Sequence, residues 1–212
     1  MMAVTMSQDT SPETGRTYGG MSAEARARSR RQRLIEAAQA VIAEHGVAAL
    51  TVEQVCQKAE LTKRYFYADF SGKDDLLDVC AEQLFSRLWD AMDGALATAS
   101  GPKRARAAIE AIVHTLASEQ ASARLYSECA AFPRLRERQQ RAIRDFSDRL
   151  AADVMPFTGN PPTGIRRDLA ARIITAGSTQ LIVDWLQGTV ETDEETIIAT
   201  IAAATRGAAA KA

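Results

Sequence analysis

The sequence predicts an all-α protein made of a small N-terminal head and a larger helical body. Hydrophobic residues make up 46% of its 212 residues, which is enough to bury a substantial core. Alanine is abundant, prolines number only six, and no alternating run of Val, Ile and Thr marks a strand. Apolar residues recur instead at helical spacing along most of the chain.

Charge is distributed unevenly along this chain. The net charge is −1, yet the segment from Arg16 to Lys73 holds ten basic residues against six acidic ones. That segment therefore has a charge of +4 and the remainder a charge of −5. A basic head on an acidic body is typical of a protein that binds nucleic acid with one end.

Residues 1–28 are rich in Ser, Thr, Gly, Glu and Arg and offer almost nothing to bury. We expect a disordered basic arm. Its last arginines run directly into Arg30 and Arg31 at the start of the first helix. Such an arm gains by counterion release when it lies along phosphates or enters a minor groove, and a solubilising tail is the alternative.

The first helix is expected from about Ser29 to His45. Its apolar stripe repeats at helical spacing, and Gly46 is placed to end it. A second helix should open at Val52, because Thr51 and Gln54 form a capping-box pair.

A third short helix follows almost at once. Thr62 is a candidate cap, and Leu61 before it can pack onto Phe66. Only three or four residues separate this helix from the second, which is the connection length of a helix-turn-helix. Its apolar face takes Phe66 and Phe70, so the remaining large side chains must stay outside: Lys63, Arg64, Tyr65 and Tyr67.

Those exposed side chains suit DNA. An Arg fork binds guanine edges, Lys meets phosphate or base, and a Tyr hydroxyl bonds phosphate. Lys73, in the first turn of the next helix, would complete an anion site with the free amides there. We expect that next helix to be capped by Ser71, with Asp74 at the capping-box position. The alternative is a solvated face on an ordinary helical hairpin.

The segment LTKRYFYADFSGKDDLL resembles the recognition helix and following helix start of the TetR family of one-component transcriptional regulators. The matching positions are Leu61, Thr62, Lys63 to Tyr65, Phe66, Tyr67, Phe70 and Lys73. The preceding RQRLIEAAQAVIAEHGVAALTVEQVCQKA resembles the first two helices of that family, so the likeness covers roughly residues 31–77.

The resemblance implies a helix-turn-helix DNA-binding domain at 29–73 and a helical effector-binding and dimerisation domain at 74–212. It also implies a set of DNA-binding residues: Arg30, Arg31, Thr51, Thr62, Lys63, Arg64, Tyr65, Tyr67 and Lys73.

Two positions depart from the family pattern. Glu60 stands where the turn commonly has Gly, so a left-handed backbone there would be strained. Asp69 stands where relatives usually carry His or Tyr facing phosphate. A carboxylate would repel phosphate, so Asp69 is expected to cap locally or to pair with a neighbouring cation.

The body is expected to begin with a long helix from Asp74 to about Ala99, which ties the head to the rest. Further helices are predicted near 103–118, within the segment SARLYSECAAF, and at 134–155, 166–187 and 193–205, with Pro156–Gly164 as a loop. Six arginines between 134 and 149 alternate with acidic residues, which favours a salt-bridged solvated face over a nucleic-acid patch.

The sequence offers little material for catalysis. The three cysteines, Cys56, Cys80 and Cys129, are widely spaced and odd in number, which favours buried thiols over a disulfide or a metal site. Two histidines, no phosphate loop and no nucleophile motif predict no enzyme and no cofactor. Without a membrane-spanning run or a signal peptide, we expect a cytoplasmic protein.

The expected function is that of a dimeric repressor, released from a palindromic operator on double-stranded DNA by a small apolar or aromatic effector. In the family, helices of the body line an effector cavity, and five residues are candidates for it: Trp89, Met92, His114, Tyr126 and Phe146. The resemblance implies a homodimer through the last two helices. Two alternatives stay open: a DNA-binding regulator without an effector, and a helical interaction module with degenerate DNA binding.

Overall fold

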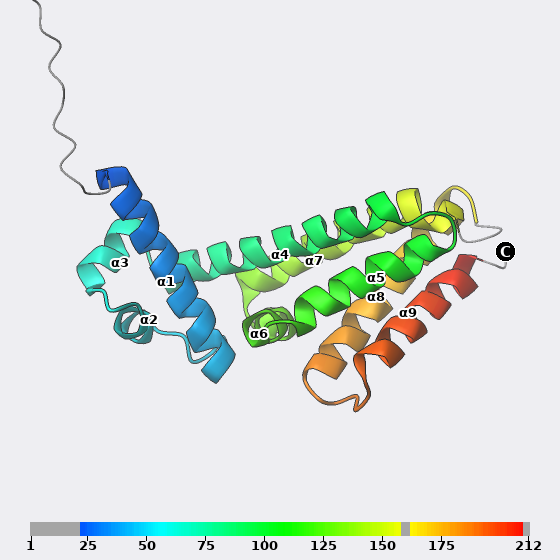
Figure 1. Ribbon diagram of the computed structural model, residues 1–212. Helices are drawn as coiled ribbons and strands as arrows, with labels where there is room; N and C mark the ends of the chain where they lie inside the picture. Colours follow the sequence, from blue (N-terminus) through cyan, green and yellow to red (C-terminus); the bar gives the residue numbers. More distant parts are fainter. Residues whose placement is uncertain (1–21, 158–161, 210–212) are drawn as a thin grey trace, which may run out of the picture.

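The computed structural model describes residues 22–157 and 162–209 of the chain. Within these ranges it contains nine α-helices, two turns of 3-10 helix and one turn of π-helix, and no strand. The expected all-α class, with a small head and a larger helical body, is confirmed (Figure 1).

The head consists of α1 (Ala23–His45), α2 (Val52–Ala59) and α3 (Lys63–Asp69). Helix α1 begins six residues earlier than the expected Ser29, because Ser22 caps it by accepting a hydrogen bond from the amide of Ala25. The end of the predicted 1–28 arm is therefore helical, and residues 1–21 of that arm lie outside the described residues. Gly46 ends α1 with a φ of 82°, and its amide bonds to the carbonyl of Ile42.

The start of α2 confirms the predicted capping box. The Thr51 hydroxyl accepts from the amide of Gln54, and the Gln54 side chain accepts from the amide of Thr51. The turn after α2 places Glu60 at a φ of 53° and ψ of 44°, the left-handed region that favours glycine. Thr62 precedes α3 as expected, but its side chain makes no capping hydrogen bond.

The start of α4 (Lys73–Thr98) differs from the expected capping box by one residue. Gly72 occupies the capping position. The Asp75 carboxylate, rather than Asp74, accepts from the Ser71 amide at 2.9 Å and from the Ser71 hydroxyl at 3.3 Å. A carboxylate in this first turn also suits the positive end of the helix dipole.

The body is a bundle of helices in which α4 runs from the head along one edge (Figure 1). Its other members are α5 (Lys103–Ala117), α6 (Gln120–Glu128), α7 (Pro133–Arg149), α8 (Ile165–Leu186) and α9 (Glu194–Ala209). A 3-10 turn, η1 (Cys129–Ala131), links α6 to α7. The π-helical turn η2 (Leu150–Val154) and the 3-10 turn η3 (Met155–Phe157) extend α7.

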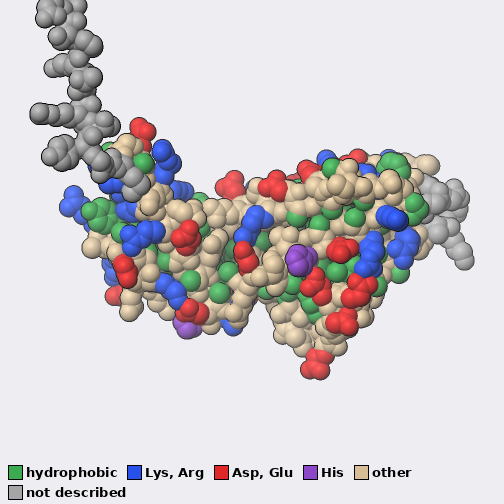
Figure 2. All heavy atoms as spheres, in the orientation of Figure 1, with side chains coloured by type: hydrophobic (Ala, Val, Ile, Leu, Met, Phe, Trp, Pro, Cys, Tyr) green, Lys and Arg blue, Asp and Glu red, His purple; other side chains and the backbone are tan. Residues whose placement is uncertain are grey.

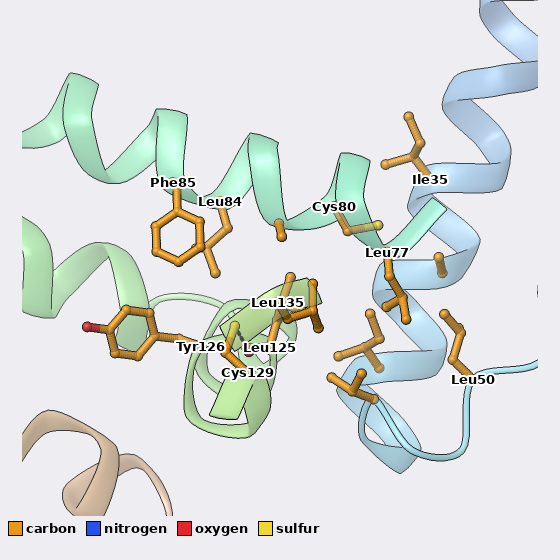
Figure 3. Close-up of a cluster of buried hydrophobic side chains, with 14 of the residues drawn as sticks. Ile35, Leu50, Leu77, Cys80, Leu84, Phe85, Leu125, Tyr126, Cys129 and Leu135 are labelled. Atoms are coloured by element: carbon orange, nitrogen blue, oxygen red, sulfur yellow. Dashed lines mark hydrogen bonds between the residues drawn. The ribbon is translucent and has the colours of Figure 1, made fainter. Parts of the chain in front are cut away.

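One hydrophobic cluster joins the head to the body. Figure 3 shows side chains from α1, α4, α6 and α7 within it, among them Ile35, Leu77 and Leu125. Leu50, from the connection between α1 and α2, is buried in the same cluster. A shared core of this kind resists independent movement of head and body, because moving one part exposes apolar surface of the other.

The predicted buried thiols and solvated arginines are both found. All three cysteines are free and buried. The arginine-rich α7 forms ion pairs along α4, with Arg138 near Glu82 at 3.8 Å and Arg149 near Asp93 at 2.7 Å. The arginines thus pair with the neighbouring helix more than with the acidic residues of their own helix. No described helix is long and apolar enough to cross a membrane.

Candidate nucleic-acid interface and body cavity

The short helix α3 presents two tyrosines and two cations on its outer face. Phe66 is fully buried, and Phe70 after the helix is nearly so, which anchors one side of α3 in the core. Tyr65 and Tyr67 are left 47% and 58% exposed. Figure 2 shows Lys and Arg side chains gathered over this head. An exposed aromatic and basic helix face of this size is the kind that reads a major groove.

The basic side chains of this surface differ in whether they form ion pairs. Arg64 is exposed and makes no ion pair within the described part of the chain. Lys63 lies 3.6 Å from Glu53 of α2, but both side chains remain mostly exposed. Lys73 is exposed in the first turn of α4. Arg64 and Lys73 therefore keep exposed charges without an ion pair in the part of the chain that the structure describes.

Thr51 and Thr62 lie at the starts of α2 and α3 and are both exposed. The Thr51 hydroxyl is already engaged with the Gln54 side chain at 2.8 Å, whereas Thr62 keeps a free hydroxyl within the described residues.

Arg30 and Arg31, which were predicted to contact DNA, bind the end of α3 in this structure. Arg30 makes a two-pronged ion pair with Asp69, through Nε to Oδ2 at 2.7 Å and Nη2 to Oδ1 at 3.0 Å. Arg31 donates to the backbone carbonyl of Asp69 at 2.6 Å. The hydrogen bond to Asp69 raises the pKa of Arg30. Of the two roles expected for Asp69, pairing with a neighbouring cation is the one observed.

The body encloses an apolar cavity among α4, α5, α6, α7, α8 and α9. The cavity is partly open to solvent. No charged side chain lies among its lining residues: Leu88, Met92, Ala105, Ala108, Ile109, Ile112, Tyr126, Phe146, Leu150, Val154, Ile174, Thr175, Ser178, Thr179, Ile182, Ile201 and Thr205. Apolar cavities with a few polar groups are the common form of small-molecule sites.

Three of the five predicted ligand residues line this cavity: Met92, Tyr126 and Phe146. Trp89 does not. Trp89 lies on the side of Phe146 that faces away from the cavity, and the two rings are stacked with their centres 4.1 Å apart. His114 is also outside, because it occupies the exposed side of α5, 3.4 Å from Glu194.

A polar edge of the cavity, on α8, was not predicted from the sequence. Thr175, Ser178 and Thr179 recur at helical spacing and face the same space as Tyr126. Burial raises the pKa of Tyr126 to about 12, and a hydrogen bond with Thr179 opposes this shift. The spacing of these hydroxyl residues within an otherwise apolar helix was the signal available in the sequence.

Helix α8 also leaves an apolar row uncovered. Ile165, Leu169 and Ile173 recur every four residues and are 69%, 52% and 72% exposed. Large side chains this exposed in a regular row mark an interaction surface. Ile174, next to this row, turns into the cavity instead.

The fold and the exposed face of α3 define a helix-turn-helix DNA-binding regulator. A sequence model described as "Bacterial regulatory proteins, tetR family" matches residues 34–80, from α1 into α4. The head therefore carries the family's N-terminal segment, and the resemblance to the TetR family of transcriptional regulators seen in the sequence is confirmed.

Solved structures of the same fold cover the head and body together. A TetR-like transcriptional regulator from Rhodococcus sp. RHA1 is 19% identical, with a TM-score of 0.68 over 83% of this chain and 93% of the other. The fatty acid degradation regulator FadR from Bacillus halodurans is 18% identical, with a TM-score of 0.71 over 84% and 95%. The ketosteroid transcriptional regulator KstR2 of Mycobacterium tuberculosis is 20% identical, with a TM-score of 0.59 over 86% and 96%. No curated protein matches the chain.

Proposed function

We propose that this protein is a dimeric repressor that binds a palindromic operator and leaves it when a neutral, mainly apolar effector fills the body cavity. The observation that carries this proposal is the position of the cavity. Tyr126 lines it from α6, and Glu128, two residues further along, contacts the head. A ligand that moves α6 therefore acts on the element that supports the DNA-binding surface.

DNA binding by the head is supported by the exposed face of α3. Arg64 and Tyr65 are placed to reach base edges, and Tyr67, Lys63 and Lys73 to meet the backbone. A helix of seven residues buries too little surface to bind tightly and specifically alone. Two heads on one palindrome, about 34–36 Å apart or a multiple of that spacing, would supply the missing contacts.

Dimerisation is supported by the uncovered row on α8. Burial of Ile165, Leu169 and Ile173 against a second copy would remove a large apolar area from water. The row lies on the body, so the dimer that it forms would carry both heads and set their spacing. The same two-fold symmetry would then appear in the operator.

The effector class follows from the polarity of the cavity. A carboxylate would lose its hydration without gaining a cation, since no charged side chain lines the space. A ketone or alcohol needs only one donor or acceptor, which the hydroxyl groups of Tyr126, Thr175 and Thr179 offer. Two of the similar structures are named for fatty acid degradation and for ketosteroids. A neutral ligand of the ketosteroid type suits the uncharged lining of this cavity better than a free fatty acid does.

Release from DNA would follow from a shift between two body shapes. The effector needs only to bind more tightly to the shape whose head spacing does not fit the operator. By linkage, operator DNA must weaken effector binding by the same factor.

The test combines selection with release. Purified protein would be used to select duplexes from a random-sequence pool, and a palindromic consensus with two half-sites one turn apart is the expected result. The neutral dye Nile red should bind the free protein, and neutral ketones should displace both the dye and the DNA more effectively than fatty acids of similar length. Recovery of no preferred duplex would contradict the proposal at its DNA step, and binding of DNA without any dye or ketone effect would contradict its effector step.

A further inference from the structure

Two neighbouring arginines of α1 hold the C-terminal end of the recognition helix α3. Arg30 grips both carboxylate oxygens of Asp69, and Arg31 donates to the backbone carbonyl of the same residue. The Asp69 side chain is 11% exposed and that of Arg30 is 22% exposed, so the pair is largely shielded from water. Two-pronged pairs between Arg and carboxylate fix geometry as well as contributing energy.

The same arginines also contact two aromatic rings, one in α3 and one just after it. The Arg30 guanidinium lies 5.3 Å from the centre of the Tyr65 ring, and that of Arg31 lies 4.2 Å from the centre of Phe70. Arg30 therefore contacts Tyr65 near the start of α3 and Asp69 at its end. This contact favours the observed placement of the Tyr65 ring, which is otherwise 47% exposed.

We propose that the Arg30–Asp69 pair is a positioning element that sets the angle of α3 and the placement of Tyr65, and that Arg30 does not act as a DNA contact. The proposal rests on DNA binding by the head. It gives a role to the aspartate that departs from the family pattern, since the pair neutralises a carboxylate that would otherwise face phosphate.

The two possible roles of Arg30, positioning α3 and contacting DNA, predict opposite effects of a substitution at Asp69 on DNA binding. The Asp69→Asn variant removes a negative charge from the head and leaves Arg30 at most one neutral hydrogen bond in place of the two-pronged ion pair. If Arg30 only served phosphate binding, this variant would bind every duplex more tightly. If the pair positions α3, binding to the selected palindromic duplex should weaken by about tenfold, the equivalent of one charge-assisted hydrogen bond. Binding to a scrambled duplex should stay equal or tighten.

Salt dependence separates the two roles for Arg30. Loss of a phosphate contact lowers the slope of log affinity against log salt by about one unit per subunit. Arg30→Gln should therefore weaken the selected duplex by about tenfold while leaving that slope unchanged. Arg28→Gln is the comparison for a phosphate contact. Arg28 is an exposed arginine of the same helix that makes no ion pair within the described residues, so its loss should lower the slope.

The full experiment measures the fluorescence anisotropy of both duplexes with wild-type protein, the three single variants and the Arg30→Gln/Asp69→Asn double variant. The double variant should lose no more affinity for the selected duplex than either single variant of the pair does, because both single variants break the same contact. Thermal unfolding by circular dichroism identifies any variant that loses the head fold, in which case the isosteric Asp69→Asn decides. Tighter binding of Asp69→Asn to both duplexes, or a reduced salt slope for Arg30→Gln, would overturn the positioning role alone. A wild-type protein that selects no duplex would overturn it together with DNA binding.

Discussion

The Glu128 carboxylate at the end of α6 accepts a hydrogen bond from the backbone amide of Val47, 2.8 Å away across the junction of body and head. The same carboxylate leaves no space beside Gly46, where a Cβ atom would come within 2.9 Å of it. Gly46 also has a φ of 82°, which a side chain would disfavour. The connection between α1 and α2 therefore packs closely against a carboxylate of the body and is hydrogen-bonded to it.

Removal of this contact should separate effector binding from DNA release. In Glu128→Ala the amide of Val47 loses its acceptor, and we expect a loss of about 1–3 kcal/mol in the free energy of unfolding. Dye binding in the cavity should persist, while the effector concentration needed to release DNA rises. Urea unfolding and a DNA release titration measure the two effects.

Gly46→Ala tests the same junction from the head. Steric conflict with Glu128 and the strained φ should together cost about 1–3 kcal/mol of stability. In the double variant with Glu128→Ala the steric part disappears, so the two losses should not add. Strict additivity in urea unfolding would show that the carboxylate does not contact Gly46 in solution.

Ile173→Glu should produce a monomer. A charge placed in the exposed row of α8 would be buried unpaired in any dimer formed there. Light scattering should report half the wild-type mass, and binding to the palindromic duplex should fall with it. Ala117→Glu adds the same charge at an exposed site of α5 and serves as the control. A dimer that survives Ile173→Glu would place the interface elsewhere.

Ala108→Phe should fill the cavity. Ala108 is buried and lines the space, so the added ring takes the place of a ligand without opening the core. Nile red binding should be lost while the affinity for the selected duplex stays close to that of wild type. Ala117→Phe, on the exposed side of the same helix, should leave both properties unchanged. Unchanged dye binding in Ala108→Phe would place the dye outside this cavity.

Arg64 and Lys73 should divide the work on DNA. Arg64→Ala should cost about 1–3 kcal/mol on the selected duplex and relax specificity at one base position, as expected for a base contact. Lys73→Ala should weaken selected and scrambled duplexes alike, as expected for a phosphate contact. Anisotropy titrations on single-base variants of the duplex make the comparison, and equal losses on all duplexes for both variants would refute this division.

Alkaline pH should destabilise the protein through its buried acids. Burial raises the pKa of Cys80 and of Cys129 from 9.0 to about 12. Between these values the folded chain keeps protons that the unfolded chain releases, so the free energy of unfolding falls as pH rises from 9 to 12. Cys80→Ala should flatten this fall in urea unfolding curves. An identical pH profile for the variant would show that Cys80 does not contribute.

Local features of the head were predictable because they depend on near neighbours in the sequence. The Thr51–Gln54 capping box and the end of α1 at Gly46 follow from residues within one turn of each other. Burial of Phe66 and Phe70 with exposure of Tyr65 and Tyr67 follows from helical periodicity alone. The family resemblance of the head has the same origin, since its motif is one continuous segment.

The roles of side chains with distant partners were decided by the tertiary structure. Arg30 meets Asp69 across 39 positions of sequence, and only the crossing of α1 and α3 shows that this arginine is taken up within the protein. His114 and Trp89 lie on the expected helices, but the rotation of α5 and α4 turns them away from the cavity. Periodicity shows which residues share a helix face, and the packing of helices decides whether that face meets core, cavity or solvent.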